Sequence, residues 1–199
     1  MRQPLIHLPE PQGLYDPEYE KDACGVGFIA HIKGVPSHQN VIDADEILRA
    51  MDHRGACGCE PNTGDGCGMM CGLPHKFLAK VAKRDLGVDL PEPGSFAAGL
   101  VFLPQDDQER AHCKQEIENL IAEYGQQFLG WRDVPQETDL ADVGPTARGS
   151  EPVIEQLFVG ASEGLSGDAF DRKLYGIHKR ASHRLRGSKT LKQALMFYI

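Results

Sequence analysis

A cysteine stands at the head of a short apolar run in which glycine alternates with larger residues, residues 24–30. This pattern predicts a strand over residues 25–32. A thiol at the start of a strand, followed by Gly25, has little bulk beside it, which suits a nucleophile. If the chain is cut just before Cys24, the new α-amino group lies beside the sulfur and can take its proton, as in enzymes with an N-terminal threonine. The alternative is that Cys24 is a small buried apolar residue, the commoner place of a free cysteine.

A second stretch with chemical potential is residues 53–68, HRGACGCEPNTGDGCG. Arg54 comes directly after a predicted helix, and an arginine that lies near a thiol favours the thiolate form. The alternative is an arginine that is simply solvated after a helix. Asp65 and Gly66 belong to a glycine-rich turn that allows close backbone approach, and we expect them to support the predicted nucleophile strand.

Residues 14–28, LYDPEYEKDACGVGF, together with residues 53–68 resemble the start of the large subunit of glutamate synthases. The first domain of that family is a class II glutamine amidotransferase, a member of the N-terminal-nucleophile hydrolases. The resemblance covers almost the whole chain in order, although the middle matches only in pattern. It implies that residues 1–23 are a leader, or propeptide, and that residues 24–199 are the N-terminal part of the amidotransferase domain.

The resemblance also implies a fold and an activity. The fold is α/β (α+β), a four-layer α-β-β-α sandwich with largely antiparallel sheets, here incomplete at the C-terminus. The activity is release of ammonia from L-glutamine at Cys24 for transfer to 2-oxoglutarate, which makes the full enzyme an oxidoreductase of glutamate biosynthesis and nitrogen assimilation. The residues that it implies as active-site support are Arg54, Gly25, Asp65 and Gly66.

An oxyanion site is missing from the sequence as given. The family uses an Asn-Gly pair, and removing one oxyanion donor typically lowers the rate by about 10²–10³. Asn40, Asn62 and Asn119 are the asparagines of this chain, and none is followed by glycine. We therefore expect residues 1–199 alone to show no glutaminase turnover. Another class II amidotransferase, with a different ammonia acceptor, is the alternative within enzymes.

The resemblance places the redox cofactors outside this chain. It implies FMN and an iron–sulfur cluster in later domains and no cofactor in residues 1–199. The implied partners are L-glutamine, the downstream synthase domains, and a small electron-transferring subunit or ferredoxin. Whether ferredoxin or a nicotinamide supplies the electrons, and what oligomer forms, stay open.

Four cysteines form a cluster in the sequence, with the spacing C-x-C-x7-C-x3-C: Cys57, Cys59, Cys67 and Cys71. This spacing matches neither the zinc patterns nor the ferredoxin runs, so we expect no metal there. A metal-binding or regulatory module that uses this cluster, without catalysis, is the alternative function from a different class.

Composition excludes several kinds of partner. The net charge of −8 does not favour phosphate backbones, and the basic residues near the end of the chain indicate a solvated helix face. No apolar stretch approaches the roughly 20 residues that cross a bilayer. The N-terminus has no secretory signal, and six cysteines in a chain of this length do not require disulfides. We expect a cytoplasmic protein that binds neither nucleic acid nor membranes.

Apolar periodicity predicts the elements that position these residues. Residues 135–152 form a polar loop, and the chain stops inside an apolar run, residues 194–199, so we expect a fragment whose partner strands are missing. The predicted helices are residues 41–52, 75–86, 106–126 and 168–186, and the predicted strands are residues 25–32, 69–73, 96–103, 128–134 and 153–159.

Overall fold

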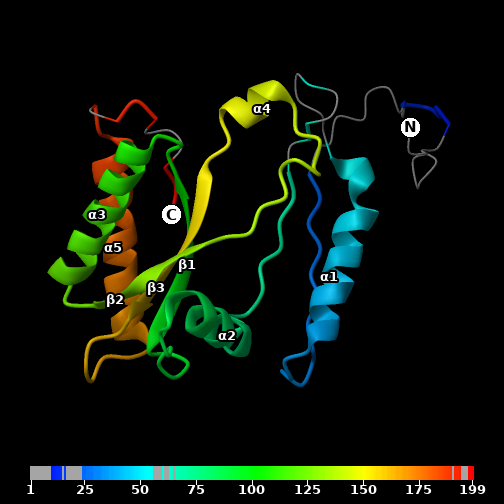
Figure 1. Ribbon diagram of the computed structural model, residues 1–199. Coiled ribbons are helices and arrows are strands. Elements are labelled where there is room, and N and C mark those ends of the chain that lie inside the picture. The colour runs from blue at the N-terminus through cyan, green and yellow to red at the C-terminus, as the bar shows by residue number, and fades with distance from the viewer. Residues whose placement is uncertain are drawn as a thin grey trace. The chain divides into compact units, whose positions relative to one another are not determined.

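The structure is a computed structural model (Figure 1) that describes residues 10–14, 16, 24–55, 60, 63–64, 66–189, 191–193 and 197–199. The chain divides into two compact units. The first, here the N-terminal unit, comprises Met1–Leu73 and Ala141–Gly144, and the second, the sheet unit, comprises Pro74–Leu140 and Pro145–Ile199. Each unit is described separately below.

An antiparallel sheet of three strands is the centre of the sheet unit. The strands are β1 (Phe96–Leu103), β2 (Gln127–Asp133) and β3 (Val153–Gly160), in the spatial order β1-β3-β2. The register of β2 against β3 shifts between Phe128 and Gly130, which is a β-bulge. Gly130 has φ +147°, a backbone conformation that side chains disfavour, so glycine suits this position.

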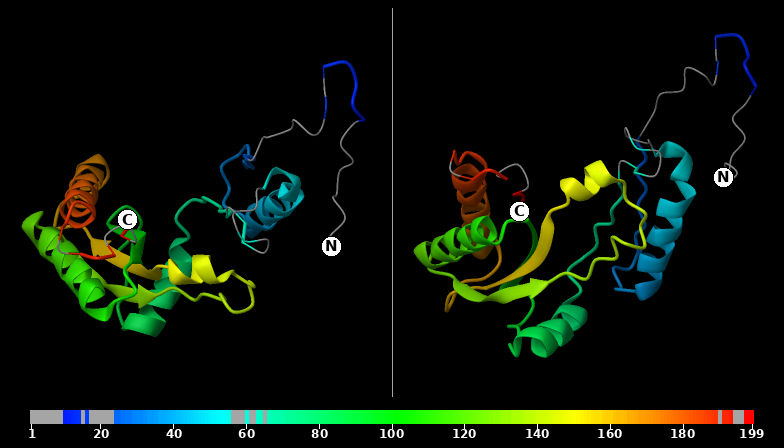
Figure 2. Two further views of the ribbon diagram at one scale, coloured as in Figure 1. Left: turned by 90° about the horizontal axis from the view of Figure 1, so that it is seen from above. Right: turned by 45° about the horizontal axis from the view of Figure 1, so that its top comes forward.

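Helices cover both faces of this sheet (Figure 2): α3 (Asp107–Glu123) and α5 (Asp168–Arg186) lie on one face, and α2 (His75–Leu86) lies on the other. The N-terminus of α3 is capped by Asp106, whose carboxylate accepts hydrogen bonds from the backbone N–H groups of Gln108 and Glu109 at 3.0 and 2.9 Å.

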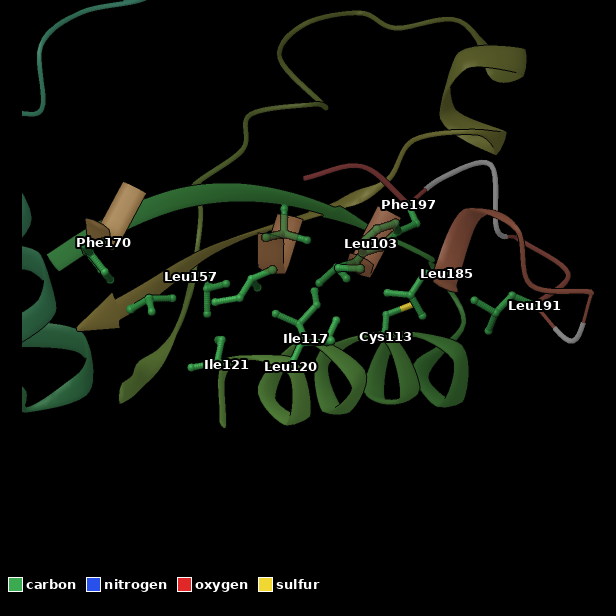
Figure 3. Packing of buried hydrophobic residues seen from close by; sticks show 14 residues of the cluster. Leu103, Cys113, Ile117, Leu120, Ile121, Leu157, Phe170, Leu185, Leu191 and Phe197 are labelled. Atoms are coloured by element: carbon green, nitrogen blue, oxygen red, sulfur yellow. The ribbon is translucent and has the colours of Figure 1, made fainter. Parts of the chain in front are cut away.

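The main hydrophobic core lies between the sheet and the pair α3 and α5 (Figure 3). From α3, Ile117 and Leu120 point toward the strands, and both are fully buried. A smaller cluster on the opposite face joins Leu78 and Ala82 of α2 to Phe96 and Phe158. Because successive strand residues point to opposite faces, the three strands supply both clusters.

The N-terminal unit contains α1 (His38–Ala50) and the short 3₁₀-helix η2 (Asp52–Arg54). The hydroxyl of Ser37 caps α1 by accepting a hydrogen bond from the backbone N–H of Gln39 at 3.1 Å. None of the 13 residues of α1, all of which the structure describes, is buried.

The structure confirms most of the predicted elements. The helix over residues 75–86, the helix over residues 168–186 and the strand over residues 96–103 have the predicted bounds. The predicted helix 106–126 is α3, and the predicted helix 41–52 corresponds to α1 followed by η2. The mixed α/β composition and the antiparallel sheet are confirmed as well.

Two predicted strands are wrong. Residues 25–32 and 69–73 form no strand in the structure, although both lie within the described part of the chain. Alternating apolar residues indicate an extended segment, but a strand also needs a hydrogen-bonded neighbouring strand. Neither segment forms such a pair with the described residues. The predicted loop 135–152 contains one short helix, α4 (Pro145–Gly149).

None of the helices in the described residues is long and apolar enough to cross a membrane.

Candidate active site

Cys24 is exposed and opens a segment that runs alongside α1 (Figure 1). The glycines of this segment face α1 and η2. A Cβ atom on Gly25 would lie 2.7 Å from Met51 Sδ, and one on Gly27 would lie 2.6 Å from Ile47 Cγ2. Both distances are shorter than ordinary contacts, so side chains at these two positions require neighbouring atoms to move. Glycine at alternate positions therefore lets the chain after Cys24 lie directly against α1 and η2.

The intervening apolar residues of this segment are exposed. Val26 and Phe28 are 96% and 89% exposed. Because the glycine side of the segment faces α1, these two side chains stand on the other side. The segment thus has the alternation of a strand, with one face packed and the other face open.

Arg54 reaches the backbone at Cys24. Its Nε donates a hydrogen bond to the carbonyl oxygen of Cys24 at 3.1 Å, across thirty residues of sequence. The absence of a side chain at Gly25 also makes room for the stem of Arg54, because a Cβ atom there would be 3.3 Å from Arg54 Cβ. The structure therefore brings together three of the predicted site residues, Cys24, Gly25 and Arg54.

The glycine-rich stretch, residues 55–68, contains a polar contact that the sequence did not indicate. The hydroxyl of Thr63 donates to the Glu60 carboxylate at 3.2 Å and accepts from the backbone N–H of Gly144 at 2.9 Å. Farther along this stretch, Gly66 has φ +89°, a conformation that favours glycine, as expected for a tight turn. Asp65 lies outside the described residues.

No sequence signal pairs Thr63 with Gly144, because 81 residues separate them. The Gly-Pro dipeptide at Gly144-Pro145 indicates a turn, and nothing more. Reasoning from sequence therefore missed Glu60, Thr63 and Gly144 as neighbours in the unit that holds Cys24.

The other cysteines fall into two groups. Cys67 and Cys71 are exposed free thiols, whereas Cys113 is buried in the core of the sheet unit. Burial, together with the nearby Glu109 carboxylate, raises the pKa of the Cys113 thiol to about 11. Among the described residues no three His, Cys, Asp or Glu side chains gather as metal ligands, and Cys57 and Cys59 lie outside those residues.

A surface hollow of about 470 Å³ lies in the sheet unit, at the start of α3. Glu109 is among its lining residues, and its carboxylate accepts hydrogen bonds from the backbone N–H groups of Lys192 and Gln193 at 2.8 and 3.0 Å. These polar groups are occupied in holding the end of the chain against α3. The hollow does not include any predicted site residue, so Cys24 and its neighbours are the better candidate for chemistry.

The arrangement at Cys24 suits nucleophilic attack on a small electrophile. The thiol is accessible, the glycine after it leaves the approach open, and a guanidinium group fixes the backbone at the same residue.

Comparison with known proteins points in the same direction. A family model described as glutamine amidotransferases class-II matches residues 24–199, so the match begins at Cys24. The "Glutamate synthase [NADPH] large chain" of Bacillus subtilis (strain 168) is 41% identical over 177 residues. The "Glutamate synthase [NADH]" of Schizosaccharomyces pombe is 40% identical over 182 residues, and the "Ferredoxin-dependent glutamate synthase 1, chloroplastic/mitochondrial" of Arabidopsis thaliana is 41% identical over 172 residues.

These relatives are much longer proteins. The matches cover 88%, 88% and 86% of this chain but only 11%, 8% and 10% of the three relatives. The chain therefore spans about a tenth of the length of the curated relatives that it matches.

Proposed function

Since this chain belongs to the class II glutamine amidotransferases, we propose that it is the glutaminase part of a glutamate synthase and that Cys24 attacks the side-chain amide of L-glutamine. The observation that carries the proposal is the position of Cys24. It is the first residue matched by the family, it is exposed, and Arg54 is bonded to its carbonyl oxygen.

The proposed reaction needs Cys24 as the first residue of the mature chain, so residues 1–23 are a removable leader. The α-amino group takes the thiol proton, and the sulfur forms a bond to the amide carbon. The carbon–nitrogen bond then breaks, and the α-ammonium group returns the proton to the departing ammonia. Water hydrolyses the thioester to give glutamate and restores the thiol.

The neighbours of Cys24 act by positioning it. Arg54 holds the carbonyl of Cys24 and thereby the direction of the thiol. Gly25 leaves space for the Arg54 stem, and Gly66 allows the turn of the glycine-rich stretch. We assign Asp65 to the same turn as a support.

We propose that the sandwich of this domain has four layers. The sheet supports this proposal because the helices leave part of it uncovered. Leu100 lies within β1, between buried residues of that strand, and its side chain is still 48% exposed. On its free edge β1 already pairs with one more residue, since Phe102 and Tyr198 exchange two backbone hydrogen bonds at 2.7 and 3.0 Å. In the N-terminal unit, the open face of Val26 and Phe28 offers apolar surface for a second sheet.

In the full protein the ammonia would pass to 2-oxoglutarate in later domains, with FMN and an iron–sulfur cluster. The described residues of this chain bring together no donor set for such a cluster. The relatives carry NADPH, NADH or ferredoxin in their names, so the proposed electron source is a nicotinamide, through a small subunit, or ferredoxin. We propose the cytoplasm as the location.

The test is covalent labelling of the processed full-length protein by a glutamine analogue with an electrophilic carbon at the amide position. We expect intact mass to show removal of residues 1–23 and one label, placed on Cys24 by peptide mapping. Cys24→Ala should abolish both labelling and ammonia release, whereas Cys71→Ala, at an exposed cysteine outside residues 53–68, should leave both unchanged. Normal ammonia release by Cys24→Ala, or by a protein that keeps its leader, would contradict the proposal.

A further inference from the structure

A short piece of the connection between β2 and β3 belongs to the N-terminal unit. Ala141–Gly144 belong to the same unit as Met1–Leu73, whereas the residues on either side, up to Leu140 and from Pro145, belong to the sheet unit. The chain thus returns to the unit of Cys24 for four residues before it forms α4. In these four residues, the backbone N–H of Gly144 donates a hydrogen bond to the hydroxyl of Thr63.

The Thr63 hydroxyl both accepts and donates a hydrogen bond. It accepts the Gly144 N–H at 2.9 Å and donates to the Glu60 carboxylate at 3.2 Å. The backbone N–H of Thr63 also donates to the carbonyl oxygen of Glu60 at 3.1 Å, which closes a turn. Only serine, among the other residues, offers the same hydroxyl at the same distance from the backbone.

Gly144 can make this contact because it has no side chain. The residue is buried, and a Cβ atom there would lie 2.1 Å from Glu60 Oε2 and 2.8 Å from Thr63 Oγ1. An alanine at this position therefore forces the Glu60 carboxylate away from Thr63. The contact is defined by hydrogen bonds on one side and by close packing on the other.

We propose that Thr63 is a positioning residue of the glutaminase site, which holds its own part of the chain against Gly144. The glycine-rich stretch begins directly after Arg54, whose Nε is bonded to the Cys24 carbonyl, and it leads into the turn at Gly66. Fixing the chain on the far side of Arg54 restricts the directions in which Arg54 and Cys24 move. The inference rests on the proposed function, because it affects catalysis only if Cys24 is the nucleophile.

The contact itself is tested by hydrogen exchange, which needs no catalysis. In Thr63→Val the Gly144 amide should exchange about two- to tenfold faster, because one hydrogen bond contributes about 0.5–1.5 kcal/mol. Thr63→Ser keeps the hydroxyl and should restore slow exchange. The amides of α5 serve as the internal control and should not change. Unchanged exchange at Gly144 in Thr63→Val would overturn the proposed contact, whatever the function of Cys24.

The positioning role is tested by the kinetics of ammonia release in the processed full-length protein. We expect Thr63→Val to lower kcat by about fivefold, with a smaller change in KM, and Thr63→Ser to restore kcat. If Thr63→Val does not fold, Gly144→Ala supplies the same test, since it displaces Glu60 instead of removing the hydroxyl. Faster Gly144 exchange with unchanged kcat would overturn the positioning role and leave the proposed function of Cys24 standing.

Discussion

The two units differ in how much apolar surface they bury. The sheet unit packs three strands against helices, and its central residues, such as Ile117 and Phe158, are fully buried. In the N-terminal unit, α1 has no buried residue, and Val26 and Phe28 of the Cys24 segment are almost fully exposed. Within the part of the chain that the structure describes, the residues proposed for chemistry therefore lie in the unit with less buried apolar surface.

The contrast also concerns the kind of contact. The sheet unit is held by hydrophobic packing and by ion pairs that join a buried side chain to a more exposed one, such as buried Arg132 with Asp85 at 2.7 Å. The N-terminal unit is held by glycine positions and by hydrogen bonds between distant residues, as in the contacts of Arg54 and Thr63. Local opening requires less free energy where fewer apolar contacts are lost, so the N-terminal unit should open more readily.

Removing core volume tests this contrast most strongly. Ile117→Ala in α3 should lower the free energy of unfolding of the sheet unit by about 2–5 kcal/mol, because it leaves a cavity in a fully packed core. Ile47→Ala in α1 is the matched substitution and should lower the free energy of unfolding of the N-terminal unit by less than about 1.5 kcal/mol, because Ile47 is only partly buried. Urea unfolding of both variants measures the difference. A larger loss for Ile47→Ala would reverse the comparison.

Adding a methyl group tests the close approach of the Cys24 segment to α1. Gly27→Ala should destabilise the N-terminal unit by about 1–3 kcal/mol, because the new methyl group meets the stiff, β-branched side chain of Ile47. Gly25→Ala should cost less, since the nearest atom is the sulfur of the flexible Met51. Hydrogen exchange of the α1 amides measures both.

A second substitution separates crowding from other effects of the alanine. The double variant Gly27→Ala with Ile47→Ala should recover part of the lost protection, because the two positions share one contact. Additive losses would show that the segment does not press on α1.

A change of pH tests the ionic contribution in the sheet unit. Hydrogen bonds from Arg84, and then from Arg132, hold the pKa of Asp85 below its usual range. A carboxyl group whose pKa is lowered by folding contributes stability above its unfolded pKa of about 3.9 and loses it as the pH falls through the lower folded value. Asp85→Asn should therefore lower the urea midpoint at pH 7, and its difference from the original protein should shrink below about pH 4. An equal difference at both pH values would show that the charge of Asp85 is not responsible.

The sequence was most informative where local pattern and packing agree. The apolar spacing of α2 and α5 gave the correct bounds because each helix buries one face on the sheet, and Gly87, at φ +70°, ends α2 as a helix-terminating glycine does. The strand over residues 96–103 was equally clear, since both of its edges pair in the structure.

The sequence was misleading where a strand depends on a partner. Residues 25–32 have the alternation of a strand, yet their glycines serve close packing on α1, and no described strand pairs with them. Periodicity records which faces are apolar and carries no information on whether a neighbouring strand is present.

The contacts of the candidate site were predictable in part. Motifs led to Cys24 and Arg54 as candidate site residues, and the structure shows a hydrogen bond between them. Thr63 and Gly144 were not identified, because a contact across 81 residues has no local pattern. Residues that meet only through the path of the chain require the fold.

The reactivity of the thiols tests how readily each unit opens, with the smallest expected effect. With a pKa of about 11, Cys113 is about one part in a thousand thiolate at pH 8, and its sulfur is buried in the core. We expect iodoacetamide at pH 8 to alkylate the exposed Cys67 within the time that leaves Cys113 unmodified, as measured by peptide mass spectrometry. In the Ile117→Ala variant, Cys113 should become reactive as the sheet unit opens more often, while the rate at Cys67 stays the same. Fast alkylation of Cys113 in the original protein would mean that the sheet unit opens as readily as the unit that holds Cys24.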